Sequence, residues 1–137
     1  MNIALIANDT KKDLLAQFCT AYCGILSKHE LLATASTGRV IKDTSGLDPH
    51  LLYSGQAGME QVETMVSVGE LDVVMLFRDG INGPASDTEN DLLRICDVHN
   101  LPVATNIATA EALIHALERG DLDWIEYARS NRAKLIF

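Results

Sequence analysis

Polar segments that directly follow apolar runs in this sequence have residue types that suit a phosphate-binding site. In chain order they are Asn8-Asp9-Thr10-Lys11-Lys12, Thr34-Ala35-Ser36-Thr37-Gly38, Ser54-Gly55-Gln56-Ala57-Gly58, Arg78-Asp79-Gly80 and Thr105-Asn106. Hydroxyl groups donate hydrogen bonds to phosphate oxygens, glycine lets the backbone approach a ligand closely, and a lysine supplies positive charge. The same residue types also cap helices and form turns. One such segment is compatible with either role, whereas several at one edge of a sheet would favour an anion site.

The apolar runs before these segments predict the strands that would gather them. The predicted strands are Asn2–Ala7, Leu31–Thr34, Leu51–Tyr53, Leu71–Phe77 and Pro102–Thr105. Amphipathic segments with helical spacing separate them. The alternation predicts a three-layer α/β fold, with a mostly parallel, five-stranded sheet and helices on both faces. Such sheets bind ligands beyond the carboxyl ends of their strands, which is where the polar segments lie.

Local signals place the ends of several predicted helices. Thr10 and Asp13 resemble a capping box, so we expect the first helix to begin there and to run to about Ser27. Thr109 is the predicted cap of a later helix, which Gly120 would close.

Length and charge limit the classes of function. The chain has 137 residues, which predicts one domain over residues 1–137, and its net charge is −8. Nucleic acids and anionic lipid surfaces bind cationic proteins, so we expect neither as a partner. A small anion is compatible with the charge, because a few backbone N–H groups and one lysine can hold it locally. No apolar stretch reaches the roughly 18–20 residues of a membrane span.

Cysteine and histidine usage predicts no disulfide and no metal. The three cysteines are irregularly spaced, and the N-terminus lacks the basic lead of a signal peptide, so a cytoplasmic location is expected. Cys19 and Cys23 lie four residues apart without a second ligand pair, and the histidines are scattered. We expect neither a metal nor a cofactor.

The polar segments resemble the motifs of methylglyoxal synthase, in the same order and at similar spacing, from Ile3 to about Trp124. That family's A-H-D-x-K-K, T-G-T-T-G and S-G-P-x-G-G-D-x-Q motifs correspond to residues 7–12, 34–38 and 54–61. Its D-P-L loop, which continues to P-H-x-P-D, corresponds to residues 79–89, and its P-V-A-T-N motif is intact at residues 102–106. Each motif is weak alone, but the set is specific.

The resemblance implies a fold, a substrate and an assembly. Family members eliminate phosphate from dihydroxyacetone phosphate and form closed homo-oligomers, typically hexamers. A small phosphorylated metabolite is therefore the expected partner, and the tail at residues 121–137 could pack at a subunit interface. The residues that match the family's phosphate ligands are Lys12, Thr34, Ser36, Thr37, Ser54 and Gly55.

The catalytic carboxylates match the family less closely. The turn after Ser54 is one residue short, so the family's base aspartate falls on Met59 or Glu60, and of these Glu60 carries a carboxylate. Asp9 and Asp79 stand where the family has aspartates. The resemblance thus implies catalytic roles for Glu60, Asp9 and Asp79, with Glu60 as the base.

The family's histidines are replaced. The histidine of the first motif is Asn8, which forms hydrogen bonds but does not exchange a proton near neutral pH. The later histidine falls on Ala85 or Ser86, and the aspartate after it on Thr88 or Glu89, of which Glu89 is the predicted catalytic group.

Two functions from different classes follow from this pattern. The first is a carbon–oxygen lyase that converts dihydroxyacetone phosphate to methylglyoxal and phosphate. The second is a catalytically inactive domain that binds a phosphorylated ligand and serves regulation or assembly, since domains of this fold also have that role. Turnover of dihydroxyacetone phosphate discriminates between them.

Overall fold

A five-stranded parallel sheet forms the centre of the computed structural model, which describes residues 1–81 and 87–132. Its strands are β1 (Asn2–Ala7), β2 (Glu30–Thr34), β3 (His50–Leu52), β4 (Val73–Phe77) and β5 (Val103–Ala104). Their order across the sheet is β3-β2-β1-β4-β5, and every neighbouring pair is parallel. The α/β fold predicted from the alternation of strands and helices is therefore confirmed.

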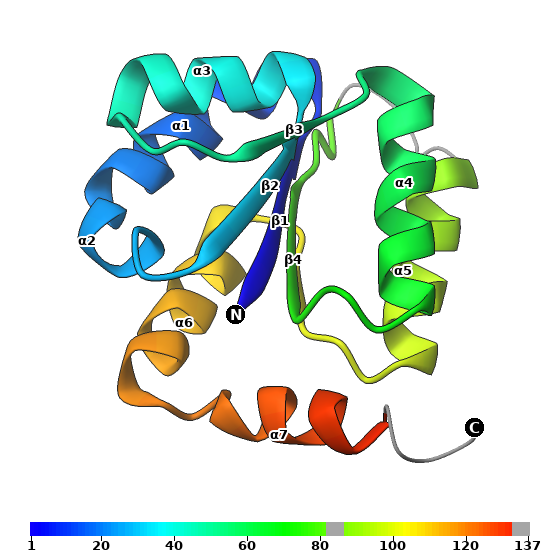
Figure 1. The fold of residues 1–137 in the computed structure, drawn as a ribbon. Helices are drawn as coiled ribbons and strands as arrows, with labels where there is room; N and C mark the ends of the chain where they lie inside the picture. The colour runs from blue at the N-terminus through cyan, green and yellow to red at the C-terminus, as the bar shows by residue number, and fades with distance from the viewer. Residues whose placement is uncertain (82–86, 133–137) are drawn as a thin grey trace.

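Helices cover both faces of this sheet. They are η1 (Asp9–Lys11), α1 (Lys12–Ala21), α2 (Cys23–Leu26), α3 (Ala35–Ser45), α4 (Gly55–Ser67), α5 (Asp87–Val98), α6 (Ile107–Arg119) and α7 (Asp123–Arg132). Helices α1, α3 and α6 lie on one face, and α4 and α5 lie on the other (Figure 1). The architecture is thus three-layered, as expected.

Successive residues of the central strand β1 point into two separate hydrophobic cores. Ile3 and Leu5 pack with side chains of α1, α3 and α6, whereas Ala4 and Ile6 pack with side chains of α4 and α5. A strand buried on both faces needs apolar residues at every position. This requirement explains why β1 and β4 are almost continuous apolar runs in the sequence.

The carboxyl ends of the strands place the polar segments at one edge of the sheet. Ala7 of β1 is in register with Phe77 of β4, and Thr34 of β2 is in register with Leu52 of β3. The Asn8 N–H donates to the Phe77 carbonyl at 2.9 Å, so the loops after β1 and β4 begin side by side. The edge that the sequence predicted as the ligand site is formed in this way.

Three helix ends differ from the sequence prediction. The first long helix begins at Lys12 rather than at Thr10, which lies in the 3-10 turn η1 and whose hydroxyl donates to Asp79 Oδ2 at 2.6 Å. It is also interrupted at Tyr22, which separates α1 from α2. The cap of α6 is Asn106, whose side chain accepts from the Thr109 N–H, so Thr109 lies inside the helix rather than at its cap.

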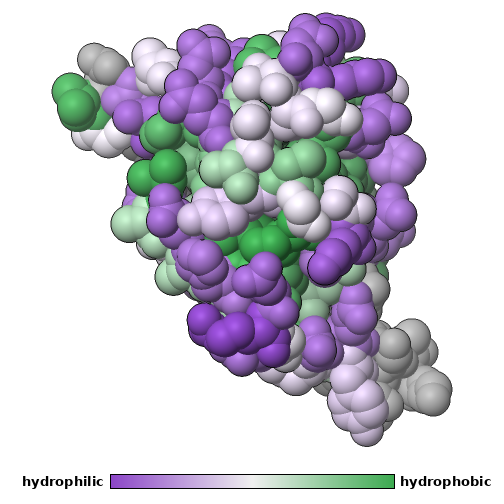
Figure 2. Space-filling model, turned by 90° about the vertical axis from the view of Figure 1, so that its left-hand side faces the viewer, coloured by the Kyte–Doolittle hydropathy of each residue, from purple (hydrophilic) through white to green (hydrophobic). Residues whose placement is uncertain are grey.

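Helix α7 runs along the opposite edge of the sheet, below the amino ends of the strands (Figure 1). Ile125 of this helix is buried, and Glu126 forms an ion pair with the Met1 amino group at 3.0 Å. Hydrophilic side chains surround a small hydrophobic area on the side of the molecule that carries α1, α2 and α3 (Figure 2). Within the described ranges, no helix is both long and apolar enough to cross a membrane.

Candidate functional site

A pocket of about 390 Å³ opens at the carboxyl edge of the sheet. Its wall includes most of the site residues predicted from the sequence, namely Asp9, Lys12, Thr34, Ser36, Thr37, Gly55 and Glu89. Ser54, Glu60 and Asp79 are not part of this wall. Pockets that hold small ligands usually begin at about 300 Å³, so this one has room for a three-carbon phosphate ester.

Lys12 is the cation on one side of the pocket. Its Nζ donates to Ser36 Oγ at 2.9 Å and forms an ion pair with Asp9 Oδ1 at 2.8 Å. The hydrogen bond from Lys12, together with its positive charge, lowers the pKa of Asp9 below the usual value. The Asp9 side chain is 94% exposed, so it occupies the solvent-facing rim of this side.

Two helices begin at the pocket, and the side chains of their N-cap residues form no hydrogen bond to the helix. Thr34 caps α3 and Ser54 caps α4, both in extended conformation, and within the described part of the chain neither side chain bonds to its helix. The first N–H groups of a helix have no partner inside the helix and carry a partial positive charge. Gly55, the first residue of α4, has a φ of 63°, which glycine adopts without strain.

The α4 terminus is held against β2 by a close approach at Gly58. A Cβ atom at this position would collide with the Tyr53 carbonyl oxygen and would lie 2.9 Å from the Thr34 methyl group. Only glycine fits there, and its small size brings the two helix starts to the same cavity.

The hydroxyl group of Thr37 has no hydrogen-bond partner among the described residues, although the residue is completely buried. Thr37 lies in the first turn of α3 and lines the pocket. An unpaired buried hydroxyl costs roughly 1–3 kcal/mol, so such groups normally have a partner. A ligand oxygen in the pocket would supply one.

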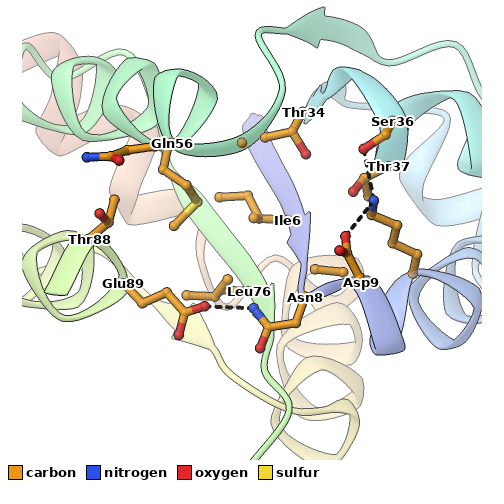
Figure 3. A pocket seen from close by; sticks show the side chains of 14 residues that line it. Ile6, Asn8, Asp9, Thr34, Ser36, Thr37, Gln56, Leu76, Thr88 and Glu89 are labelled. Carbon is orange, nitrogen blue, oxygen red and sulfur yellow. Dashed lines mark hydrogen bonds and ion pairs between the residues drawn. The ribbon is translucent and has the colours of Figure 1, made fainter. Parts of the chain in front are cut away.

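Glu89 and Asn8 lie on the other side of the pocket, across the apolar side chains of Ile6 and Leu76 (Figure 3). Asn8 Nδ2 donates to Glu89 Oε1 at 2.6 Å, and Arg78 Nε lies 3.5 Å from Glu89 Oε2. The Glu89 side chain is only 13% exposed. The pocket therefore has a cationic side and a carboxylate side with an apolar floor between them.

Asp79 supports the pocket from outside. Its N–H donates to Asn8 Oδ1 at 2.7 Å, and its carboxylate accepts from the Thr10 hydroxyl and the Ile81 N–H. These bonds tie the loop after β4 to the loop after β1. In this structure Asp79 fixes Asn8 in place, and its predicted catalytic role is untested.

The structure brings Met59, not Glu60, to the pocket wall. Glu60 is exposed on α4, and its Oε1 accepts from Gln56 Nε2 at 3.3 Å. In the later motif, Thr88 and Glu89 both line the pocket, whereas Ala85 and Ser86 lie outside the described residues. The placement of Glu60 is thus not the one expected of a base, although its catalytic role has not been tested.

Sequence reasoning did not single out several residues of this site. Ile6 and Leu76 form part of the apolar floor. Both residues could have been identified from the sequence, because each lies near the carboxyl end of its predicted strand. Arg78 follows β4 directly, and its ion pair with Glu89 could not be read from spacing, because the two come from different loops.

Among the described residues, no three His, Cys, Asp or Glu side chains form a group suited to a metal ion. Cys19 is buried in the core, and burial raises the pKa of its thiol to about 12. Cys19 is therefore a residue of the hydrophobic core.

Comparison with known proteins shows extensive similarity to one family, although no protein-family model matches the chain. The chain is 52% identical over 128 residues to the methylglyoxal synthase of Caldicellulosiruptor saccharolyticus, over 92% of the chain and 91% of the relative. It is 46% identical over 136 residues to that of Oceanobacillus iheyensis, over 98% and 97% of the two chains. A crystal structure of methylglyoxal synthase from Elizabethkingia anophelis matches with a TM-score of 0.77 at 34% identity, over 82% of this chain and 76% of that one.

Proposed function

Because the chain belongs to the methylglyoxal synthase family, we propose that it is a carbon–oxygen lyase that converts dihydroxyacetone phosphate to methylglyoxal and phosphate. The observation that carries the proposal is the pocket itself. It joins a side that carries Lys12 and two helix starts to a side that carries the sheltered Glu89 carboxylate, across an apolar floor.

The phosphate group is proposed to bind at the first turns of α3 and α4. Backbone N–H groups of both helix starts would donate to its oxygens, and Lys12 would supply the charge. The buried, unpaired hydroxyl of Thr37 is the strongest support, since a phosphate oxygen would complete its hydrogen bonding. Ser36 already accepts from Lys12, and the Thr34 and Ser54 hydroxyls stay predicted ligands.

The three-carbon part of the substrate would then extend over Ile6 and Leu76 towards Glu89. A carboxylate removes a proton from the hydroxymethyl carbon, and the electron pair of that C–H bond forms the double bond of an enediolate, with the charge on the former ketone oxygen. The hydroxyl proton on that same carbon then moves to the former ketone oxygen, and the freed oxygen electron pair forms the aldehyde C=O. The double bond shifts to the terminal carbon as its C–O bond breaks, and the electron pair of that bond leaves with phosphate. The remaining enol takes a proton on its terminal carbon to give methylglyoxal. No oxidant or reductant is needed.

Among the predicted catalytic carboxylates, Asp9 and Glu89 are those at the pocket. Glu60 lies on the outer surface of α4, and Asp79 is engaged in fixing the loops. The proposal therefore assigns proton transfer to a group on the pocket wall.

Binding without turnover is the other function predicted from the sequence. Met59 on the pocket wall and Asn8 at the position of a family histidine are the observations that make it worth testing. A single ¹H and ³¹P NMR time course with dihydroxyacetone phosphate separates the two. Release of phosphate with appearance of the methylglyoxal methyl signal supports the lyase, whereas saturable binding without product supports the binding function. The absence of any binding would refute both.

A homo-oligomer, with six subunits by resemblance, and a cytoplasmic location are also proposed. Large apolar side chains stand exposed at several places, among them Leu51 and Tyr53 at the edge strand β3, and Trp124 and Tyr127 on α7. Burial of such side chains between subunits would support assembly, and residues 121–137 would then take part in it. Light scattering after size-exclusion chromatography measures the mass directly, and a monomer would refute this proposal.

A further inference from the structure

The middle of the pocket is apolar, whereas its two ends are polar. Ile6 and Leu76 form the floor of this middle part, and Met59 of α4 also lies on the pocket wall. Ser36 lies at one end of the floor and Glu89 at the other (Figure 3). A ligand that reaches from one polar end to the other therefore places its central atoms against these apolar side chains.

The floor is the outer surface of the hydrophobic core between the sheet and helices α4 and α5. Ile6 and Leu76 are buried members of this core, and the partly buried Met59 packs against the same core. Hydrocarbon groups form no hydrogen bonds, and the thioether sulfur of methionine is only a weak acceptor. A ligand hydroxyl group that faces these side chains loses its hydrogen bonds to water and gains none of similar strength.

Met59 is also a point at which this chain departs from its family. It occupies one of the two positions on which the family's base aspartate falls, and it is the one of the two that lies on the pocket wall. A carboxylate there would accept a hydrogen bond from a ligand hydroxyl group, whereas the thioether does so only weakly. The residue at this position therefore changes which central group of a ligand the pocket accepts.

The shape of the central carbon decides what a three-carbon phosphate ester places against the floor. A ketone carbon is planar, so it can lie flat on an apolar surface with its oxygen atom directed sideways. A tetrahedral carbon directs substituents out of that plane. In the hydrate of a ketone both of these substituents are hydroxyl groups, so one of them faces the floor in either orientation.

We propose that Met59 is a specificity-determining residue, which acts with Ile6 and Leu76 to select three-carbon phosphate esters without an out-of-plane hydroxyl group on the central carbon. The inference rests on the proposed function and names the form of the substrate. The pocket binds the free ketone of dihydroxyacetone phosphate in preference to its hydrate or to the corresponding alcohol. Apolar sites discriminate against an added hydroxyl group by up to about 100-fold.

Two phosphate esters that lack a carbonyl group, and so do not react, isolate the central position. 3-Hydroxypropyl phosphate and glycerol phosphate have the same chain length and the same terminal hydroxyl group, and they differ only in the hydroxyl group on the central carbon. We expect calorimetry to show that 3-hydroxypropyl phosphate binds about 10- to 100-fold more tightly than the weaker-binding enantiomer of glycerol phosphate. If both enantiomers bind within about twofold of 3-hydroxypropyl phosphate, the proposal is overturned.

Met59→Gln tests the residue, because glutamine has a similar length and adds an amide that can pair with the hydroxyl group. We expect the preference for 3-hydroxypropyl phosphate to fall below about threefold, while the affinity for inorganic phosphate stays within about twofold. Met59→Leu keeps an apolar side chain and should keep the preference. A folded Met59→Gln protein with the wild-type preference would remove Met59 from this role.

Met65→Gln is the matched control. Met65 lies on the same helix and packs against the same core, but it is not on the pocket wall. We expect this variant to be less stable than the wild type and to keep the full preference for 3-hydroxypropyl phosphate. Loss of the preference in Met65→Gln would show that general loosening of the core changes selectivity, and would overturn the proposal. The wild-type comparison requires no variant, so it decides even if Met59→Gln does not fold.

Turnover of dihydroxyacetone phosphate, measured on the same wild-type preparation, separates this inference from the lyase function. Preference for 3-hydroxypropyl phosphate without turnover would support the specificity and refute the lyase. Turnover without the preference would leave the lyase standing and overturn the role of Met59. A protein that binds neither ester nor inorganic phosphate would refute both.

Discussion

Thr37→Val should raise stability and weaken phosphate binding at the same time. The substitution exchanges a hydroxyl for a methyl group of nearly the same size, in the first turn of α3. Most changes in a buried core lower stability. A variant that is more stable but binds phosphate more weakly would therefore show that this hydroxyl serves ligand binding rather than stability.

The magnitudes follow from the environment of the side chain. Thr37 is completely buried, and its Oγ1 finds no partner in residues 1–81 and 87–132. Since an unpaired buried hydroxyl costs about 1–3 kcal/mol, the free energy of unfolding without ligand is expected to rise by about 1 kcal/mol. A hydrogen bond to a charged group contributes about 1.5–3 kcal/mol, so phosphate affinity should fall roughly 10- to 150-fold.

The assay pairs chemical denaturation of the unliganded protein with calorimetric titration of inorganic phosphate. Thr44→Val is the control, since Thr44 is exposed on the same helix and is not on the pocket wall. It is expected to leave phosphate affinity unchanged. A Thr37→Val protein that loses more than about 1 kcal/mol of stability would show that the hydroxyl is bonded within the protein. A folded variant with unchanged phosphate affinity would refute the proposed phosphate site.

Three further changes test the surroundings of the pocket. Gly58→Ala forces a Cβ against the Tyr53 carbonyl, so we expect a loss of about 1–3 kcal/mol in unfolding free energy and weaker phosphate binding, both measurable on the purified variant. Asp9→Asn frees Lys12 from its ion pair, so calorimetry should show phosphate affinity rising roughly two- to fivefold, and a decrease would contradict this account. Burial of His29, and next the charge of the N-terminal amino group, lowers the pKa of this imidazole, so the unfolded state binds a proton more readily than the folded state. The free energy of unfolding should therefore fall as the pH drops below about 6.5. Chemical denaturation at pH 7.5 and 5.5 measures this difference, and His29→Gln should make it smaller.

The layers of the fold could be predicted from the sequence because they depend on local patterns. The strands β1 and β4 are continuous apolar runs, and the helices between strands carry apolar residues at helical spacing. The helix starts were less predictable. The local pattern predicted a cap at Thr10, whereas its hydroxyl contacts Asp79, a residue of another loop that sequence spacing does not identify.

The position of Glu60 could have been predicted from the periodicity of α4. Val62 and Val66 mark the buried stripe of this helix, and Gly58 continues it four residues earlier. Glu60 lies two residues before Val62, about 200° around the helix, and therefore faces outward. Met59 lies three residues before Val62, on the inner side. The motif alignment left both open, and helical geometry distinguishes them.

The pairing of Asn8 with Glu89 could not be predicted in this way. The two residues lie 81 positions apart, and their contact depends on the adjacent carboxyl ends of β1 and β4 and on the entry of α5. Strand order in a parallel sheet is a tertiary property. Sequence patterns place both residues at the same edge, but only the packed structure makes them neighbours.

The two sides of the pocket depend on the sequence in different ways. The phosphate half depends on helix starts, whose N–H groups are present whatever the side chain, and serine at Ser36 still provides a hydroxyl. The proton-transfer half depends on one carboxylate held to within about 1 Å. The Asn8–Glu89 bond of 2.6 Å is such a restraint, and it joins α5 to β1 rather than α4 to the pocket. We therefore expect substitutions in the first turn of α5 to change turnover more than phosphate binding.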